Sequence, residues 1–338
     1  MNSWTTTSRP LTDTDLDLDA ALSLVQRDAA CPLTPAGYRK KLDAGEYRRE
    51  WTWLAVDDTS GEALAVAVWW GSPDEAAPAS LDAFFVHGSI GTGARRVALA
   101  GELIRTAHQH YVAEYGLSTI QIPDYHVFVP GDWRDHPDVV EALGWRVEAV
   151  ARAGLTDLLE RLRYEWTPAD GLPLDTSRLT FRAEPDDEVF VDLFARVLAG
   201  SLDTTSTAAA AVVGAQAQAR EDVVACQTML VGERTWWRVA QDASGDVVGF
   251  AVPSRNLAFP VVGYLGVLPE YRGHGYGDDI LRAITRILVD EVDAQTIRAD
   301  TDLVNRPMAA AFERVGYRNF ARRLVYSAPK RAESDPAQ

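Results

Sequence analysis

The sequence predicts an α/β protein with two tandem domains, each a mixed, mostly antiparallel β-sheet flanked by helices. Three observations predict it. The chain has 338 residues, enough for two domains that each bury a core. A pattern in the first half returns in the second half in the same order. The second half places a β-rich hairpin before alternating strand-like runs and a helix with an apolar stripe, which is typical of a mixed sheet covered by helices.

The repeat is clearest where Trp53–Ala67 echoes Trp237–Ala251, an offset of 184 residues from position 53 to position 237. Each copy reads as two β-rich runs joined by an Asp-x-Ser-Gly turn, which is a hairpin signal. Three more pairs keep the order: Gly91–Gly93 with Gly275–Gly277, Leu143–Trp145 with Val315–Tyr317, and Arg9–Asp13 with Arg182–Asp186. The pair Leu143–Trp145 with Val315–Tyr317 has an offset of only 172, so we expect 12 extra residues in the first copy.

Domain boundaries follow from residues that break regular structure. Pro168, Gly171 and Pro173 interrupt the pattern between the two copies. We expect a first domain at 1–166, a linker at 167–178, a second domain at 179–328 and a flexible tail at 329–338. In the second half the expected strands are Val223–Val231, Trp236–Val252, Val261–Val267, Thr296–Thr301 and Phe320–Ser327, and the expected helices are Gly277–Val292 and Arg306–Val315.

Composition restricts the class of protein. A hydrophobic share of 47% and a charged share of 24% are those of a soluble globular protein. There is no apolar run of about 20 residues and no secretion-type N-terminus. Cys31 and Cys226 form neither a disulfide framework nor a metal-site spacing, so we expect a cytoplasmic protein without a metal. The net charge of −16 disfavours nucleic acid and anionic membranes as partners.

The segment from Val267 to Gly277 is the strongest functional signal. Gly273, Gly275 and Gly277 let backbone N–H groups turn outward, and the following helix presents its positive end to them. Arg272 adds a guanidinium suited to phosphate oxygens. The pattern predicts a diphosphate site, with a plain glycine-rich turn as the alternative.

Two motifs carry a resemblance to a known family. Arg272–Gly277 reads Arg-Gly-His-Gly-Tyr-Gly and resembles the pyrophosphate loop Gln/Arg-x-x-Gly-x-Gly/Ala of the GNAT N-acetyltransferase superfamily. Asn305–Tyr317 is similar to that family's second cofactor motif, Asn-x-x-Ala-x-x-x-Tyr-x-x-x-Gly-Phe, with Met308 at the alanine position and Phe312 at the tyrosine position. The resemblance covers about Leu179 to Ser327 and reaches the first half through the repeat.

The resemblance implies an acyl-CoA-dependent N-acyltransferase. It would transfer acetyl from acetyl-CoA, or an acyl group from another acyl-CoA, to a primary amine of a small molecule by direct attack. It also implies that the strands Val261–Val267 and Thr296–Thr301 splay apart and that the Val267 N–H polarises the thioester carbonyl. The cofactor-binding residues it implies are Leu265, Val267, Arg272, Gly273, His274, Gly275, Tyr276, Gly277, Asn305 and Phe312.

Acid and base candidates lie close to these motifs. Asp300 is five residues before Asn305, where the resemblance suggests a general base, and Asp302 would face the same way. The alternative is that these aspartates cap the strand end or hold Arg298 and Arg306. Asn305 has an alternative of its own, as the N-cap of the helix that follows.

The general acid is not identified by the motif, because Phe312 stands at the position where the family usually has a tyrosine, and a phenyl ring cannot donate a proton. Tyr264, Tyr276 and Tyr317 are the possible substitutes, with Tyr264 favoured, and solvent is another proton source. His274 is expected to contact phosphate or solvent rather than act in acid–base chemistry.

The first copy has lost part of the loop pattern. Gly91 and Gly93 remain, but Gly88 stands at the arginine position and no Asn-x-x-Ala motif follows. We expect a degenerate domain that supports the second one, with Arg95 and Arg96 as an alternative phosphate contact. A short helix is expected to end at Gly144–Trp145, and His108 and His110 are expected at the surface.

Other functions remain open on the sequence. A non-catalytic acyl-CoA-binding sensor or scaffold would fit Phe312. Aminoacyl transfer from charged tRNA occurs on tandem copies of this fold, but the net charge opposes it. Ser201–Arg220 falls where the family builds its acceptor wall. The oligomeric state is open, and a monomer with an internal pseudo-dimer is compatible with the repeat.

Overall fold

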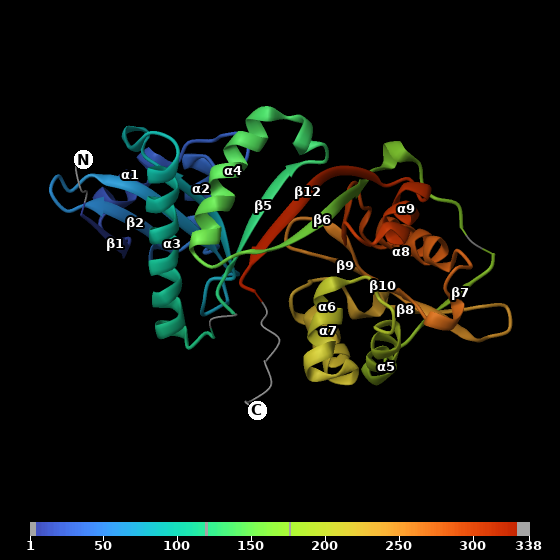
Figure 1. Cartoon of the computed structure of the whole chain (residues 1–338). Helices are drawn as coiled ribbons and strands as arrows, with labels where there is room; N and C mark the ends of the chain where they lie inside the picture. The colour runs from blue at the N-terminus through green and yellow to red at the C-terminus, as the bar shows by residue number, and fades with distance from the viewer. Residues whose placement is uncertain (1–4, 119–120, 176, 330–338) are drawn as a thin grey trace, which may run out of the picture. The chain divides into compact units, whose positions relative to one another are not determined.

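The computed structural model describes residues 5–118, 121–175 and 177–329, and it divides into two compact units (Figure 1). Unit 1 contains the described residues up to Glu160 and those from Arg323 on, and unit 2 is Arg161–Arg322. These bounds differ from the expected domains 1–166 and 179–328. The expected tail at 329–338 lies outside the described residues, apart from Pro329.

Strand pairing explains the difference. Strand β6 (Asp157–Trp166) pairs antiparallel with β11 from Trp166 to Arg161, and so draws 161–166 into unit 2. Strand β12 (Arg318–Ser327) ends in unit 1, where Leu324 and Tyr326 join the hydrophobic core. The chain therefore passes from unit 1 to unit 2 and returns to unit 1 with its last strand. Pairing between segments this far apart in sequence leaves no local signal.

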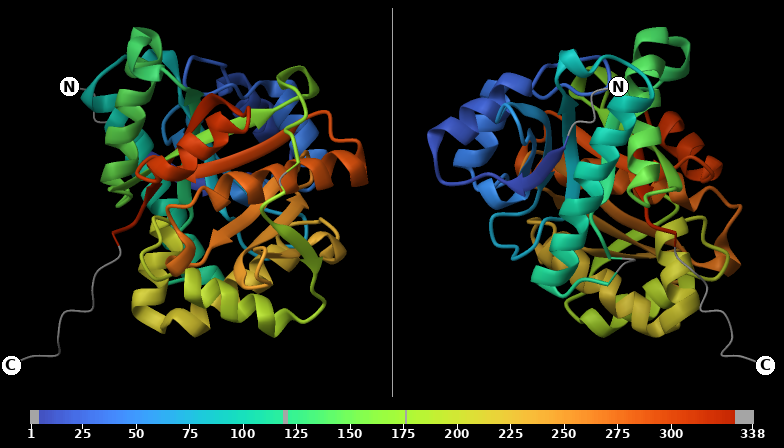
Figure 2. Two further views of the ribbon diagram at one scale, coloured as in Figure 1. Left: turned by 90° about the vertical axis from the view of Figure 1, so that its right-hand side faces the viewer. Right: turned by 60° about the vertical axis from the view of Figure 1, so that its left-hand side comes forward.

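Unit 1 is a sheet with the strand order β1-β2-β3-β4-β5-β12. Its other strands are β1 (Thr6–Pro10), β2 (Thr52–Asp57), β3 (Ala63–Trp70), β4 (Ser80–Val86) and β5 (Asp124–Pro130), and its helices are α1 (Asp15–Leu24), α2 (Pro35–Asp43), α3 (Ala94–Tyr115) and α4 (Pro137–Arg152). Side chains alternate along β2, so that Trp53 and Ala55 pack with α3 and α4 whereas Leu54 packs with α1. Helices therefore cover both faces, with α3 and α4 side by side on one of them (Figure 2).

Unit 2 is a sheet with the strand order β6-β11-β10-β9-β8-β7. Its elements besides β6 are β7 (Thr180–Ala183), β8 (Arg238–Gln241), β9 (Val247–Arg255), β10 (Pro260–Val267), β11 (Ile297–Asp302), α5 (Asp187–Val197), α6 (Thr204–Val213), α7 (Ala215–Thr228), α8 (Tyr276–Val292) and α9 (Arg306–Arg314). The expected strands over β8 to β11 and the expected helices α8 and α9 are confirmed. The expected hairpins are confirmed in both units as β2–β3 and β8–β9.

One expected strand is wrong, because Val223–Val231 lies largely within α7. Ala219 and Val223 are the apolar residues that this helix buries, and their spacing of four places them on one face. The β-branched residues that suggested a strand include Val224, which is 49% exposed, and Val231, which follows the helix. Tertiary packing thus overrides β propensity here.

The repeat match of Leu143–Trp145 with Val315–Tyr317 is also wrong. Gly144 and Trp145 lie inside α4 rather than at a helix end. The glycine that ends α4 is Gly154, with φ 96°, and its counterpart after α9 is Gly316, with φ 98°. The offset from position 154 to position 316 is 162, so the first copy holds 22 residues more than the hairpin offset of 184 gives.

His108 is buried on α3 with 3% of its surface exposed, which corrects the expectation of a surface residue. Its Nε2 accepts a hydrogen bond from Trp69 Nε1 at 3.3 Å. Burial lowers the pKa of His108 to about 4 from 6.5. His126 on β5 behaves alike, because burial and the Arg323 charge lower its pKa to about 3. His110 is exposed, as expected.

We expect acid to destabilise unit 1 through His108. Between about pH 6.5 and 4, His108 is protonated in the unfolded chain but neutral in the folded chain. The free energy of unfolding therefore falls as the pH falls through this window, and it is fully kept above pH 6.5. The loss for His108 is roughly 3 kcal/mol. Thermal unfolding followed against pH should show a shallower dependence for His108→Gln, whose side chain stays neutral. Equal slopes in the two proteins would contradict this account.

Within the described residues, no helix combines the length and the apolar character needed to cross a bilayer.

Candidate functional site

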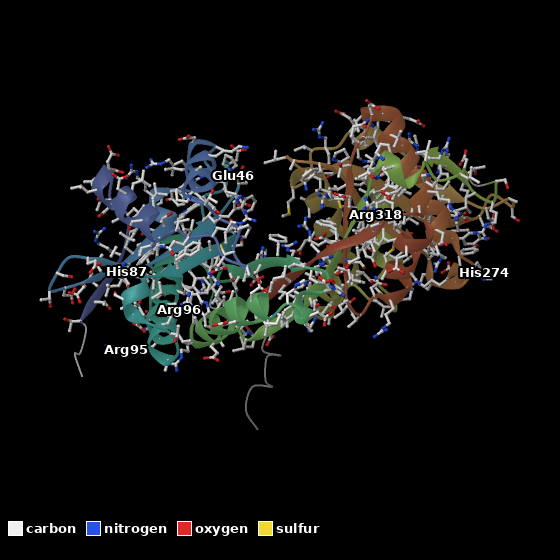
Figure 3. All side chains as sticks on the ribbon, turned by 90° about the horizontal axis from the view of Figure 1, so that it is seen from above. Glu46, His87, Arg95, Arg96, His274 and Arg318 are labelled. Atoms are coloured by element: carbon white, nitrogen blue, oxygen red, sulfur yellow. The ribbon has the colours of Figure 1, made fainter. Side chains whose placement is uncertain are left out.

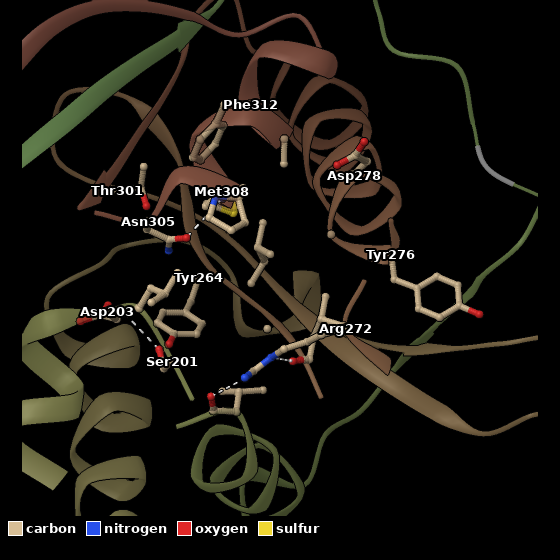
Figure 4. Close-up of a pocket in the computed structure, with 18 of the residues that line it drawn as sticks. Ser201, Asp203, Tyr264, Arg272, Tyr276, Asp278, Thr301, Asn305, Met308 and Phe312 are labelled. Atoms are coloured by element: carbon tan, nitrogen blue, oxygen red, sulfur yellow. Dashed lines mark hydrogen bonds between the residues drawn. The ribbon is translucent and has the colours of Figure 1, made fainter. Parts of the chain in front are cut away.

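A cavity of about 640 Å³ lies in unit 2, where β10 and β11 diverge (Figure 4). The two strands run parallel but pair at a single position, Val261 with Arg298, whereas β10 pairs with β9 along its length. The splayed strands that the sequence analysis expected are therefore present. Ser201 and Asp203 lie toward one end of the cavity and Tyr276 toward the other, with Tyr264 and Arg272 between them (Figure 4).

The free edge of β10 supplies backbone donors to this cavity. The Leu268 N–H donates to the Val248 carbonyl on β9 at 2.9 Å. Because successive residues of a strand point their N–H groups to opposite sides, those of Leu265 and Val267 face the side of β11. Both residues line the cavity. An extended chain with amide groups could therefore pair along β10 as an additional strand would.

The glycine loop closes the other end of the cavity and has the geometry of an anion site. Gly273 and Gly275 adopt φ values of 84° and 77°, and Gly275 is the N-cap of α8. Across the described residues, no acceptor is found for the backbone N–H groups of the segment 273–277. Unsatisfied N–H groups at a helix N-terminus favour bound phosphate.

Arg272 differs from the expected phosphate fork. Its Nη1 and Nη2 donate to the carbonyls of Ala199 and Val197 at 2.6 and 2.7 Å, and its Nε donates to the Val267 carbonyl at 3.2 Å (Figure 4). The side chain therefore caps the C-terminus of α5 and ties it to β10. All three nitrogens are committed to backbone, so the first role of this arginine is to hold the loop in place.

A second arginine beside the loop was missed by the sequence analysis. The Arg178 guanidinium donates to the His274 carbonyl at 2.9 Å, pairs with the buried carboxylate of Asp279, and lies over the Tyr276 ring at 5.3 Å. Half of its side chain is exposed. It comes from the end of the expected linker, where nothing in the local sequence marks it. His274 itself is exposed at the periphery of unit 2, outside the cavity lining (Figure 3).

Asn305 has the N-cap role that was the alternative, and its contact with a cofactor stays a prediction. Its Oδ1 accepts from the Met308 N–H at 3.3 Å, which makes it the N-cap of α9, and the residue also lines the cavity. Phe312, on the same helix, is 2% exposed and stacks on Tyr164 with ring centroids 4.8 Å apart. Phe312 thus contributes an apolar wall.

Of the three tyrosines considered as acids, the geometry favours Tyr264. Tyr317 is buried, and its hydroxyl is bonded to Thr285 at 2.8 Å. The Tyr276 ring points away from the group formed by Tyr264, Ser201 and Asp203 (Figure 4). Tyr264 lines the cavity, and no hydrogen-bond partner of its hydroxyl is found in the described residues.

The Tyr264 ring is held firmly and stays protonated. It packs on Phe194 at 4.6 Å and lies parallel to Phe250 at 5.8 Å between centroids. Burial first, and then the charges of Asp203 and Asp222, raise the pKa of Tyr264 above its ordinary value. The phenol is therefore neutral at physiological pH and has a proton to donate.

Asp300 and Asp302 each pair with an arginine of β6. Asp300 lies 3.2 Å from Arg163 and Asp302 lies 3.1 Å from Arg161, each opposite its partner in the sheet. Asp302 is buried, and its other oxygen accepts from the Thr204 N–H of α6 at 2.7 Å. Asp300 is 24% exposed, so it is the more accessible of the two in the cavity lining.

The loop of unit 1 keeps its glycines but not the arginine. Gly93, with φ 81°, is the N-cap of α3, as Gly275 is of α8, which moves the equivalence by two residues from the sequence match. Gly91 then corresponds to Gly273, and Ile90, rather than Gly88, stands at the position of Arg272. Ile90 is buried at 9% exposure. A shift by two is invisible in sequence because the glycines alternate.

Side chains fill the region of unit 1 where β4 and β5 diverge. These strands pair only at Ser80–Asp124 and Leu81–Tyr125. Beyond that point Phe84 of β4 contacts both Tyr125 and Trp145, with ring centroids 5.3 Å apart in each case. Arg96, labelled on α3 in Figure 3, stacks on Trp145 at 3.8 Å. The guanidinium that was the alternative phosphate contact is thus engaged with an aromatic ring.

A buried arginine completes this filling. Arg146 of α4 is fully buried and pairs with Asp28 at 2.6 Å. Aligned on the glycines that end α4 and α9, Leu143, Trp145 and Arg146 correspond to Asn305, Pro307 and Met308. Unit 1 therefore has bulky side chains, and no asparagine, where unit 2 has its cavity.

Comparison with known proteins finds a family match within unit 2 and a similar fold over most of the chain. Residues 212–317 match the acetyltransferase (GNAT) family model. The chain is similar in fold to a GCN5-related N-acetyltransferase from Sphaerobacter thermophilus, at 14% identity and a TM-score of 0.55 over 95% of this chain and 94% of that one.

Two further solved structures align at lower scores. A tandem GNAT protein from the clavulanic acid biosynthesis pathway aligns at 18% identity and a TM-score of 0.48 over 97% and 100% of the two chains. A GNAT-family acetyltransferase from Colwellia psychrerythraea aligns at 11% identity and a TM-score of 0.43 over 96% and 100%. No curated protein matches the sequence at a significant level.

Proposed function

We propose that unit 2, in which residues 212–317 match the GNAT acetyltransferase family model, binds an acyl-CoA and transfers its acyl group, acetyl in the first instance, to a primary amine of a small molecule. One observation carries the proposal. The unsatisfied N–H groups of 273–277 and the free edge of β10 line the same cavity. A diphosphate joined to an amide-bearing arm matches that pair of features.

Different residues of the cavity would bind different parts of the acyl-CoA. The backbone N–H groups of Gly273–Gly277 would hold the diphosphate, and Arg272 would fix the loop that presents them. Leu265 and Val267 would pair with the pantetheine amides through their N–H groups. Asn305, Met308 and Phe312 would form the wall on the side of α9. His274 lies outside the cavity lining, so its ring would not contact the diphosphate.

The reaction would be a direct transfer. The amine nitrogen forms a bond to the thioester carbonyl carbon, and the carbon–sulfur bond breaks. Asp300 would take the proton from the amine, directly or through water, because an alkylammonium with a pKa of about 10 must lose one before attack. The Val267 N–H would stabilise the charge on the carbonyl oxygen. Tyr264 would donate its phenolic proton to the departing sulfur.

We further propose that unit 1 is a degenerate copy that binds no acyl-CoA. Phe84, Trp145 and Arg146 occupy the space that is open in unit 2. The proposal therefore predicts one acyl-CoA for each chain.

Calorimetric titration with CoA tests both proposals through two matched variants. Gly275 and Gly93 are each the N-cap of a helix, and both have positive φ. We expect Gly275→Val to lower CoA affinity at least tenfold, because a β-branched residue distorts the loop backbone. Gly93→Val imposes the same strain in unit 1 and should leave affinity and stoichiometry unchanged. Two sites per chain, or equal losses in both variants, would contradict this assignment.

A non-catalytic acyl-CoA-binding module is the second candidate, because Phe312 stands where the family has its usual acid. Thiol release from acetyl-CoA with a panel of primary amines separates the two functions. Binding without release from any amine would favour the module.

A further inference from the structure

The charged groups around the cavity of unit 2 are balanced except at one position. Its lining contains three arginines, Arg161, Arg272 and Arg314. Arg161 pairs with Asp302, and Arg314 holds Asp278 through two hydrogen bonds of 2.7 and 2.8 Å. Arg272 donates to backbone carbonyls. Each cation of the lining is thus already engaged.

Asp203 is the exception among the carboxylates of the lining. Asp278, Asp300 and Asp302 each have an arginine partner. Asp203 has no cation within ion-pair distance in the parts of the chain that the structure describes. Its Oδ1 accepts from the Ser206 N–H at 3.0 Å as the N-cap of α6, which leaves the second oxygen without a partner.

The surroundings of Asp203 form a polar group at one end of the cavity. Its own N–H donates to Ser201 Oγ at 3.1 Å, and this bond fixes the turn before α6. The Thr204 N–H next to it is held by the buried Asp302. Figure 4 places the carboxylate near the Tyr264 side chain. The carboxylate and the Tyr264 hydroxyl oxygen are acceptors, which an ammonium group with its three donors can satisfy together.

We propose that Asp203 binds the protonated amine of the acceptor, and that the acceptor is a small alkylammonium compound that carries no carboxylate or phosphate. This inference rests on the proposed function of unit 2 and goes further by naming the residue and the class of substrate. An acceptor that carried its own anion would meet no free cation in the lining. Asp203 is also accessible to a ligand, because it is only half-buried.

The substitution Asp203→Asn isolates the charge. Asparagine is as good an N-cap as aspartate, so the bond to Ser206 and the start of α6 are kept. The matched control is Asp290→Asn on the exposed face of α8, outside the cavity lining, which removes the same charge from the same unit.

The probes are n-hexylamine and 6-aminohexanoate, which share a primary amine and a chain of similar length but differ in a carboxylate. Titration of the CoA-saturated protein measures their binding directly, without turnover. We expect n-hexylamine to bind at least tenfold more tightly than 6-aminohexanoate. Asp203→Asn should weaken n-hexylamine about 10- to 100-fold, the range of a hydrogen bond to a charged group, and leave CoA affinity unchanged.

The outcomes separate the inference from the proposed function. Equal n-hexylamine affinity in Asp203→Asn and the parent, or tighter binding of 6-aminohexanoate, overturns the inference even if amines are acetylated. A comparable loss in Asp290→Asn overturns it as well, since the effect would then be general charge. If n-hexylamine binds through Asp203 but no amine releases thiol, the inference holds for binding and the transferase proposal fails.

Where turnover is measured, the expected change lies mainly in KM. Removal of a binding charge should raise the KM for n-hexylamine more than it lowers kcat. A fall in kcat at unchanged KM would instead assign Asp203 to the chemical step and overturn its role as the binding group.

Discussion

Tyr264→Phe should lower kcat about 100-fold while the affinity for acyl-CoA stays within about twofold, because general acid catalysis contributes roughly 10²–10⁴ in rate. The phenylalanine keeps the packing on Phe194 and Phe250, so the cavity wall is unchanged. Only the hydroxyl that can protonate the leaving sulfur is lost. Steady-state kinetics with acetyl-CoA and an accepted amine measure the effect.

Tyr276→Phe is the matched control, since the Tyr276 ring points away from the Tyr264 and Asp203 end of the cavity (Figure 4). We expect its kcat to equal that of the parent. The raised pKa of Tyr264 also predicts that kcat is kept well into alkaline pH, because the phenol stays protonated above its ordinary range. Unchanged kcat in Tyr264→Phe would mean that solvent supplies the proton.

Arg272→Ala should destabilise unit 2 by about 3 kcal/mol and abolish measurable CoA binding, although the side chain is not placed as a phosphate ligand. Three backbone carbonyls, those of Val197, Ala199 and Val267, lose a charged donor together. The end of α5 and the start of the loop then lose their connection. Denaturant unfolding and CoA titration measure the two effects.

Arg178→Ala is the contrasting variant, because that guanidinium lies beside the same loop, donates to the His274 carbonyl and is half exposed. It should cost less stability than Arg272→Ala, because Arg282 still pairs with the buried Asp279 at 3.0 Å after the substitution. If Arg272→Ala unfolds at the same denaturant concentration as the parent, the capping role assigned to Arg272 is wrong. The sequence motif alone would have assigned this arginine to phosphate binding.

The elements that sequence could predict are those with strong local signals. The hairpins, the glycine loop and the helix α8 follow from turn residues and apolar spacing within about twenty residues. The cavity follows from the same segments, because the loop and β10 are adjacent in the chain. Tyr264 could be favoured over Tyr276 and Tyr317, but the reason appears only in space, where Thr285 engages Tyr317.

The features that sequence could not predict depend on partners far along the chain. Arg272 contacts carbonyls more than 70 positions away, and Asp300 pairs with an arginine 137 positions away. The same holds for β6 and β12, each of which has residues in both units. It also holds for His108, whose hydrogen-bond partner Trp69 is 39 positions away. Asp203 showed no motif, because what distinguishes it is the absence of a cation among neighbours that only the fold assembles.

The return of β12 to unit 1 affects the order in which the two sheets can be completed during biosynthesis. Residues 324–328 reach the core of unit 1 from the far end of the chain. Unit 1, most of which precedes unit 2 in the chain, therefore waits for β12 before its sheet is complete, while every strand of unit 2 has already emerged. A nascent chain would expose the outer edge of β5 until β12 has emerged, and unpaired edges of this kind are sites of aggregation.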